Sequence, residues 1–168
     1  PYDKQKVWAS TLMDMEYNAA TEPSMGARLG RDVTTKLILT SLFYVDENST
    51  VRDNVHAIMQ ADLDIYSGVH LSTLANIFYQ RGFFNNRLVS GPITSNRTWL
   101  FYRWVQGDVT IKSEVTVTVP ANAFLFVGNG NKIYIESGGT IQIDPSARII
   151  CYDNNAVIIS QSTSTISS

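Results

Sequence analysis

The chain has 168 residues, of which 44% are apolar and 17% are charged, and its formal net charge is −2. This length and apolar content suffice for one ordinary domain or two small ones with a packed core, which excludes a wholly disordered chain. The low, slightly acidic charge argues against a nucleic-acid partner, whose phosphates require basic residues, and no apolar run is long enough for membrane insertion.

The first half of the chain has the three- and four-residue apolar spacing of short helices. We expect helices over residues 4–20 and 32–44, and a third that is capped by Ser49 or Thr50 and ends before Gly68. A fourth helix is expected over residues 69–81, with Gly82 as its left-handed C-terminal residue. Helices this short are unstable alone in water, so residues 1–87 are predicted to form a helical anchor domain.

A change of period marks the second half. Residues 88–97, with Ser90-Gly91-Pro92 at their centre, are expected to be a linker. Residues 98–105 are dense in aromatic and branched side chains and predict a first strand. The remaining predicted divisions are a shaft over residues 98–160 and a polar tail over residues 161–168.

An eight-residue unit repeats seven times between Val109 and Ile159, and each unit opens with two apolar residues separated by one position. Alternate side chains of a strand point the same way, and the small residues between the pairs suit corners. We therefore predict an α+β fold class, in which the helical domain precedes a β-helix or β-prism. The predicted core positions are Val109, Ile111, Val117, Val119, Leu125, Val127, Ile133, Ile135, Ile141, Ile143, Ile149, Cys151, Val157 and Ile159, with Cys151 as a buried thiol.

Two assemblies satisfy this octad, and one further arrangement is an alternative. In a single-chain β-helix, three octads form a coil of 24 residues, so that Val109, Ile133 and Val157 stack. In an intertwined trimer each chain supplies one face of every layer, and an antiparallel meander or sandwich is the third arrangement. Burying two aliphatic residues contributes roughly 3–6 kcal/mol, whereas ordering eight residues costs about 12 kcal/mol. Since partner chains would supply the missing burial, we favour the trimer, with the octad positions at its core.

The octad of Val-x-Val and Ile-x-Ile pairs followed by small turn residues resembles the trimeric triple-stranded β-helices of phage tail spikes and type VI secretion spike proteins. More broadly, a helical anchor followed by a β-structured trimer is similar to phage head fibres, tail fibres and tailspike adaptors. The resemblance implies a non-enzymatic homotrimeric virion protein, assembled in the host cytoplasm. Its helical half would bind other virion proteins, and its shaft would serve host attachment.

Residues with catalytic or metal-binding chemistry are few, and each has a structural explanation. The two histidines with their nearby aspartates are expected on a solvated face, the glycine loop lacks the helix of a phosphate-binding loop, and the carboxylates fall at octad corners. These candidates are His56, His70, Asp62 and Asp64, the loop 128–131, and Glu136, Asp144 and Asp153. We predict no catalytic residue, no metal site and no cofactor.

Two other functions remain open. The first is a carbohydrate- or receptor-binding module at a fibre tip, where aromatic rings stack on the sugars of a host surface glycan and amides bind hydroxyls. The residues suited to this role are Tyr134, Tyr152, Phe126, Asn129 and Asn131; packing between chains is the alternative role of the rings. The second is a polymerising β-helical scaffold whose ends stack.

Overall fold

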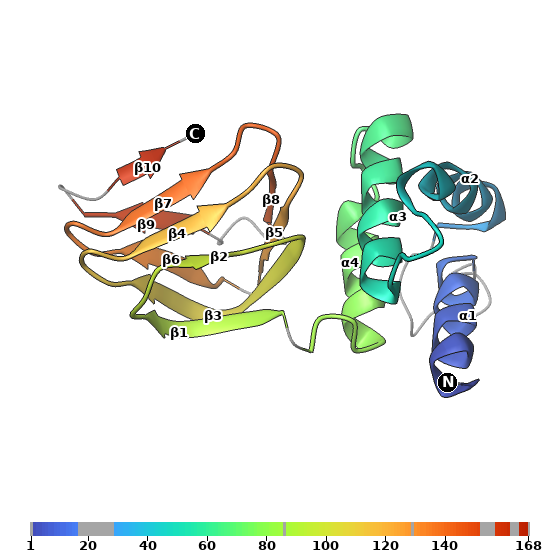
Figure 1. The fold of residues 1–168 in the computed structure, drawn as a ribbon, viewed down its shortest axis with the longest axis horizontal. Coiled ribbons are helices and arrows are strands. Elements are labelled where there is room, and N and C mark those ends of the chain that lie inside the picture. Colours follow the sequence, from blue (N-terminus) through green and yellow to red (C-terminus); the bar gives the residue numbers. More distant parts are fainter. Residues whose placement is uncertain are drawn as a thin grey trace. The chain divides into compact units, whose positions relative to one another are not determined.

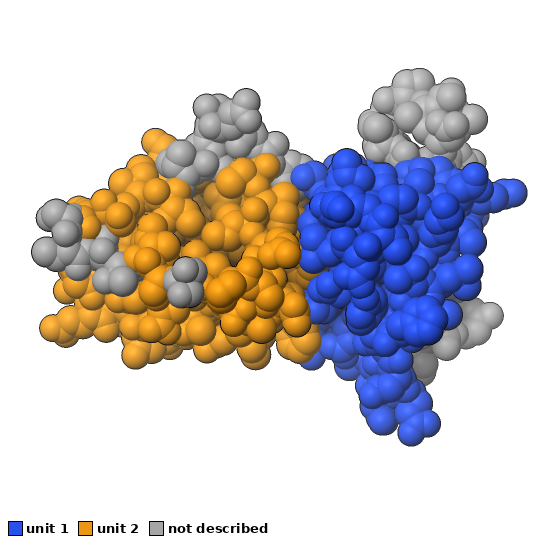
Figure 2. Space-filling view, turned by 90° about the horizontal axis from the view of Figure 1, so that it is seen from above, with its two compact units in different colours: residues 1–85 blue, residues 86–168 orange. Residues whose placement is uncertain are grey.

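The structure, a computed structural model, describes residues 2–16, 29–85, 87–128, 130–151, 157–161 and 165–167. The chain divides into two compact units, residues 1–85 and residues 86–168 (Figure 2). The first holds helices and the second holds strands (Figure 1). Strand β1, Leu88–Ile93, lies in the stretch predicted as a linker, so the strand unit begins earlier than residue 98.

The helical unit follows the apolar spacing of its sequence. Its described elements are α1 Tyr2–Glu16, α2 Arg31–Ser41, the 3-10 turn η2 Leu42–Tyr44, α3 Val51–Tyr66 and α4 Leu71–Gln80. As predicted, Thr50 caps α3, because its hydroxyl accepts the Asp53 N–H while the Asp53 carboxylate accepts the Thr50 N–H at 2.8 Å. The predicted left-handed glycine is also confirmed, with a φ of +79° at Gly82.

One apolar stripe of each helix forms the core of this unit. The side chains of Met15, Leu37, Val55, Leu74 and Phe78, one or two from each α-helix, have no exposed surface. Their helical spacing predicted this burial.

The strand unit contains two parallel sheets. Its strands are β1 Leu88–Ile93, β2 Arg97–Thr98, β3 Tyr102–Ile111, β4 Thr116–Val119, β5 Phe124–Val127, β6 Lys132–Ile135, β7 Thr140–Ile143, β8 Arg148–Cys151, β9 Val157–Ser160 and β10 Thr165–Ser167. One sheet has the order β8-β5-β3-β6-β9, with β1 also paired to β3, and the other has the order β10-β7-β4-β2. In Figure 1 the strands of this unit curve around a common interior.

The prediction of an α+β fold with a β-helix or β-prism in an intertwined trimer is wrong. The described residues form an α/β fold of helices and parallel sheets, with a curled half-barrel in which the strands pair within one chain. The curl arises at β3, because its residues 102–105 pair with β5 while residues 109–111 pair with β6, so that two arms of the sheet leave one long strand. A trimer was predicted because two buried residues per octad do not offset the cost of ordering the octad. The single chain already provides the missing burial, since Phe124 and Phe126 are also buried.

Three strand pairs, β3 with β6, β4 with β7 and β5 with β8, have a spacing of three octads. Val117 pairs with Ile141 and Leu125 pairs with Ile149, each at a separation of 24 residues. The next turn of the chain contains one residue more, because Ile133 pairs with Ile158 rather than with Val157. A slip of one residue exchanges the two faces of a strand, so Ile158 packs against the core while Ile159 is 39% exposed.

The burial of the predicted core positions therefore decreases toward the last octads. The earlier positions are at most 2% exposed: Val109, Ile111, Val117, Val119, Leu125, Val127, Ile133, Ile135 and Ile141. Ile143 and Ile149 are partly buried against the same cluster. Cys151 is exposed, so the prediction of a buried thiol is wrong, as is the core assignment of Ile159. The side chain of Val157 lies outside the described residues.

Candidate functional site

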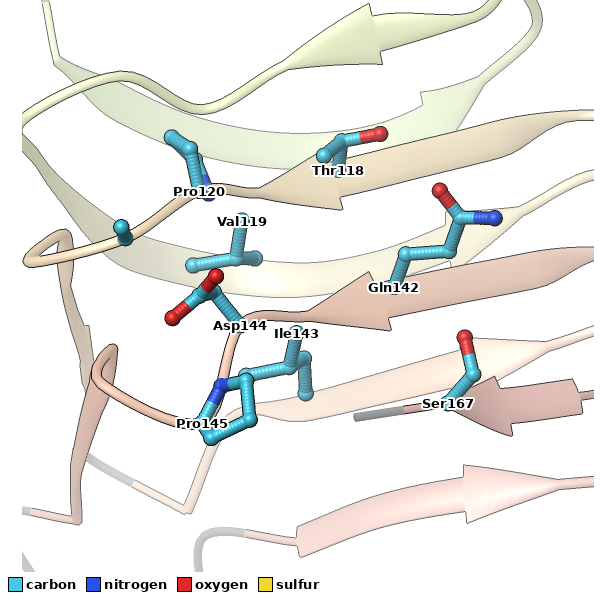
Figure 3. Close-up of a pocket in the computed structure, with 9 residues that line it drawn as sticks. Thr118, Val119, Pro120, Gln142, Ile143, Asp144, Pro145 and Ser167 are labelled. Carbon is cyan, nitrogen blue, oxygen red and sulfur yellow. The ribbon is translucent and has the colours of Figure 1, made fainter.

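A groove lies over the ends of β4 and β7, in the sheet that also contains β10 (Figure 3). Its volume is about 380 Å³, and its lining residues are Thr118, Val119, Pro120, Ala121, Gln142, Ile143, Asp144, Pro145 and Ser167. Gln142 is the parallel partner of both Thr118 and Ser167, so three polar side chains form a row across three strands. The groove combines this polar row with the two proline rings at its corner.

The carboxylate of Asp144 in this groove is bound to the turn that follows it. Its Oδ1 accepts the Ser146 hydroxyl at 2.7 Å and the Ser146 N–H at 2.8 Å. These two hydrogen bonds, that of the hydroxyl first, hold the pKa of Asp144 below its usual value. An acid with a lowered pKa is ionised at neutral pH and is a poor proton donor, so the geometry gives Asp144 a role in the turn.

Of the two other carboxylates that were expected at octad corners, Glu136 and Asp153, the structure describes Glu136. Glu136 accepts a hydrogen bond from Lys112 Nζ at 2.5 Å, and this contact is the first cause that lowers the pKa of Glu136. Glu136 also accepts the Ser113 N–H at 3.4 Å, so it ties neighbouring corners together. Asp153 lies outside the described residues. The structure thus gives both described carboxylates a structural function at a corner.

The predicted glycan-binding residues do not form one accessible site in the described part of the chain. Phe126 is fully buried and stacks on Trp104 with ring centroids 5.9 Å apart, so its face is closed to a sugar. The Asn131 amide donates to the Val105 carbonyl at 3.0 Å, and Tyr134 is half-buried in β6. Tyr152 and Asn129 lie outside the described residues.

A buried hydrogen-bonded pair joins α3 to the start of α4. Asp62 has no exposed surface, and its carboxylate accepts the His70 N–H at 3.0 Å and lies 2.7 Å from His70 Nδ1. The predicted solvated position of Asp62 is therefore wrong, whereas Asp64 is exposed and accepts a hydrogen bond from Gln60. Within the residues that the structure describes, no three His, Cys, Asp or Glu side chains are grouped as metal ligands.

A second hollow lies between β1, β2 and the start of β3, and sequence reasoning missed it. Its volume is about 540 Å³, and it is lined by Leu88, Val89, Ser90, Pro92, Ile93, Ser95, Asn96, Arg97, Thr98, Trp99 and Arg103. Residues 88–97 were expected to be a linker, so no site was predicted there. A usable signal was present, since Arg97 and Arg103 flank Trp99 with no acidic residue between them.

The helical unit exposes an apolar surface that we call the α2 patch, formed by Leu39, Leu42, Phe43 and Tyr44. Leu39 is 58% exposed, Leu42 is 59% exposed and Phe43 is 89% exposed. Leu39, Leu42 and Phe43 are three and four positions apart, which places them on one side of the helix and its 3-10 extension. Clustered exposed apolar residues commonly mark a surface for another protein.

Comparisons of the chain with protein-family models, with curated proteins and with solved structures find no match. A search for membrane-spanning segments among the described helices finds none with the required length and apolarity.

Proposed function

We propose that this chain is a non-enzymatic structural protein of a virus particle, a homotrimeric fibre or spike of a bacteriophage. The helical unit attaches it to other virion proteins, and the strand unit projects as a stiff element that serves host attachment. In this proposal the chain is assembled into the particle in the host cytoplasm. The observation that carries the proposal is the α2 patch, in which neighbouring exposed apolar residues are clustered on a helical unit with a buried core of its own.

The α2 patch supports a docking role because leaving these side chains in water is unfavourable. Covering one large apolar side chain contributes about 1.5–3 kcal/mol, so Leu42 and Phe43 together form a useful anchor. They are the first two residues of η2, directly after the end of α2, where a partner surface can cover both at once.

The strand unit supports the mechanical role. Its inward side chains are packed within one chain, and parallel pairs such as Val117–Ile141 place apolar side chains of successive turns next to each other. Dense packing of this kind resists deformation. Because the strands pair within the chain, the three copies of the proposed homotrimer associate through the surfaces of folded chains, and three copies multiply weak host contacts.

The experiment that tests this function detects the chain in particles. An antibody raised against the purified chain is applied to density-purified particles from the source of the sequence, by blotting and by immunogold electron microscopy. We expect particle-bound protein and label on projections. Absence of the chain from the particles would overturn the proposal.

The docking role has a matched pair of variants. Phe43→Ser removes the most exposed ring of the α2 patch, while Val69→Ser removes an apolar side chain that is 73% exposed beyond α3. Supplied in trans as tagged chains, Phe43→Ser should enter particles at least about tenfold less than the wild type, since about 1.4 kcal/mol equals tenfold. Val69→Ser should enter normally. Equal incorporation of both variants would remove the α2 patch from the proposal.

Oligomeric state is measured independently by mass photometry. A homotrimer has three times the mass of the 18.7 kDa chain. A monomer as the sole species at micromolar concentration would contradict the homotrimer, and concentration-dependent filaments would favour a polymerising scaffold.

A receptor-binding module is the second candidate function. The groove favours it, because the hydroxyl-bearing Thr118, the amide-bearing Gln142 and the rings of Pro120 and Pro145 line the same hollow (Figure 3). A glycan array separates the two functions, since reproducible glycan binding that is lost in Gln142→Ala would favour the module.

A further inference from the structure

We propose that the hollow lined by Arg97 and Arg103 is a binding site for a sugar that bears a carboxylate, such as a uronic acid. This site is distinct from the groove over β4 and β7, and it stands on its own geometry whether or not the chain is a virion protein. The hollow is built by β1, by the turn that leads to β2, and by the segment between β2 and β3.

The charge of the hollow selects an anion. Its lining residues include Arg97 and Arg103 and no Asp or Glu. The whole chain, in contrast, has a net charge of −2, so the positive charge here is local. Arginine presents a planar fork of donors that binds both oxygens of a carboxylate, which makes it the preferred partner of such a group.

The framework positions the backbone of Arg97 and the side chain of Arg103. Arg97 lies on β2, where it is the parallel partner of Val117, and its side chain is exposed. Arg103 Nη1 donates to the carbonyls of Leu100 at 3.2 Å and Tyr102 at 3.0 Å, which fixes its guanidinium beside the hollow.

The remaining polar groups suit hydroxyls. Asn96 Oδ1 accepts the Thr116 N–H at 2.8 Å, and this contact orients the amide and its two N–H donors. The hydroxyls of Ser90, Ser95 and Thr98 line the same hollow, and each can both donate and accept. A ring with several hydroxyls can donate to and accept from these groups, whereas an inorganic anion mainly accepts.

The size and wall of the hollow also fit a single sugar. Its volume of about 540 Å³ lies within the range of small-molecule sites. Trp99, which is 3% exposed, belongs to the buried core behind this wall, so a sugar would be held by the polar lining and not by stacking on a ring.

The test measures binding of sodium glucuronate to the full chain by isothermal titration calorimetry, with glucose and inorganic phosphate as comparison probes. We expect glucuronate to bind with a Kd of about 1 mM or tighter, and glucose to bind at least about tenfold more weakly. No glucuronate binding at about 50 mM, glucose binding of equal strength, or tighter binding of phosphate would each overturn the assignment.

Two variants of the same residue locate the site. Arg97→Ala should weaken glucuronate binding at least about tenfold, and Arg97→Lys, which keeps the charge but loses the fork, should give an intermediate loss. Lys36→Ala is the matched control, because it removes one exposed positive charge from α2. Wild-type binding by both Arg97 variants, each with a normal circular dichroism spectrum, would overturn the site. If Arg97→Ala does not fold, Arg97→Lys decides the same question.

Discussion

Val117 and Ile141 are partners in adjacent parallel strands, and neither side chain has any exposed surface. Each therefore forms part of the other's apolar environment. Ile141→Asp would bury a carboxylate without a partner, which costs about 3–5 kcal/mol. We expect the strand unit to unfold at a much lower denaturant concentration, as measured by tryptophan fluorescence at Trp99 and Trp104.

The matched control for this variant is the next residue. Gln142 is exposed on the same strand, so Gln142→Asp introduces the same charge in water and should change the free energy of unfolding by less than about 0.5 kcal/mol. Equal unfolding midpoints for the two variants would mean that Ile141 is not in the core.

The octad predicted which residues are inward but not which strands pair. An apolar pair such as Val117 and Val119 has the same sequence pattern whether its neighbour is another chain or a later octad of the same chain. Hydrogen bonding decides between them, and it connects residues that are 24 positions apart. The sequence also did not predict the extra residue before Ile158. Val157, Ile158 and Ile159 are all apolar, so the apolar pattern is satisfied whichever face of the strand points inward.

The Asp62 carboxylate accepts the His70 N–H while fully buried. Asp62→Ala leaves that N–H without its acceptor and removes the contact to the His70 ring, so we expect a loss of about 1–3 kcal/mol in the free energy of unfolding of the helical unit. Circular dichroism at 222 nm during urea denaturation measures it. Asp64→Ala, at an exposed position on the same helix, should have a much smaller effect, and comparable losses would contradict this role of Asp62.

Local signals were the most predictive part of the helical sequence. The cap at Thr50 and the left-handed Gly82 were both visible, because each depends only on neighbouring residues. The pair of Asp62 and His70 was not, since it requires α4 to fold back beside α3. The hollow at Arg97 and Arg103 was missed for the same reason, as its walls come from separate strands.

The capping box predicts an acid-sensitive helix. The Thr50 hydroxyl donates to Asp53 Oδ2 at 2.6 Å and is the main cause that lowers the pKa of Asp53. A folded-state pKa below the unfolded value adds stability above the unfolded pKa, and this stability is lost as the pH falls through the folded pKa. The free energy of unfolding of the wild type should therefore fall more than that of Asp53→Asn between about pH 6 and about pH 2.5.

Removing the hydroxyl isolates its contribution. Thr50→Ala should destabilise the helical unit by about 1 kcal/mol at neutral pH. The difference in free energy of unfolding between the wild type and this variant should become smaller in acid, because Asp53 is then protonated. An identical pH dependence for the wild type and Asp53→Asn would show that this carboxylate does not contribute.

Cys151 ends β8 as an exposed thiol, where its sequence position predicted a buried one. Its parallel partner Val127 is 2% exposed, so burial falls sharply from one strand to the next along the same arm of the sheet. We expect the native chain to react with Ellman's reagent at a rate within about tenfold of the urea-unfolded chain, because exposure controls access to a thiol. Cys151→Ser should abolish the signal without changing the unfolding midpoint. Protection of the native thiol by several orders of magnitude would restore Cys151 to the core.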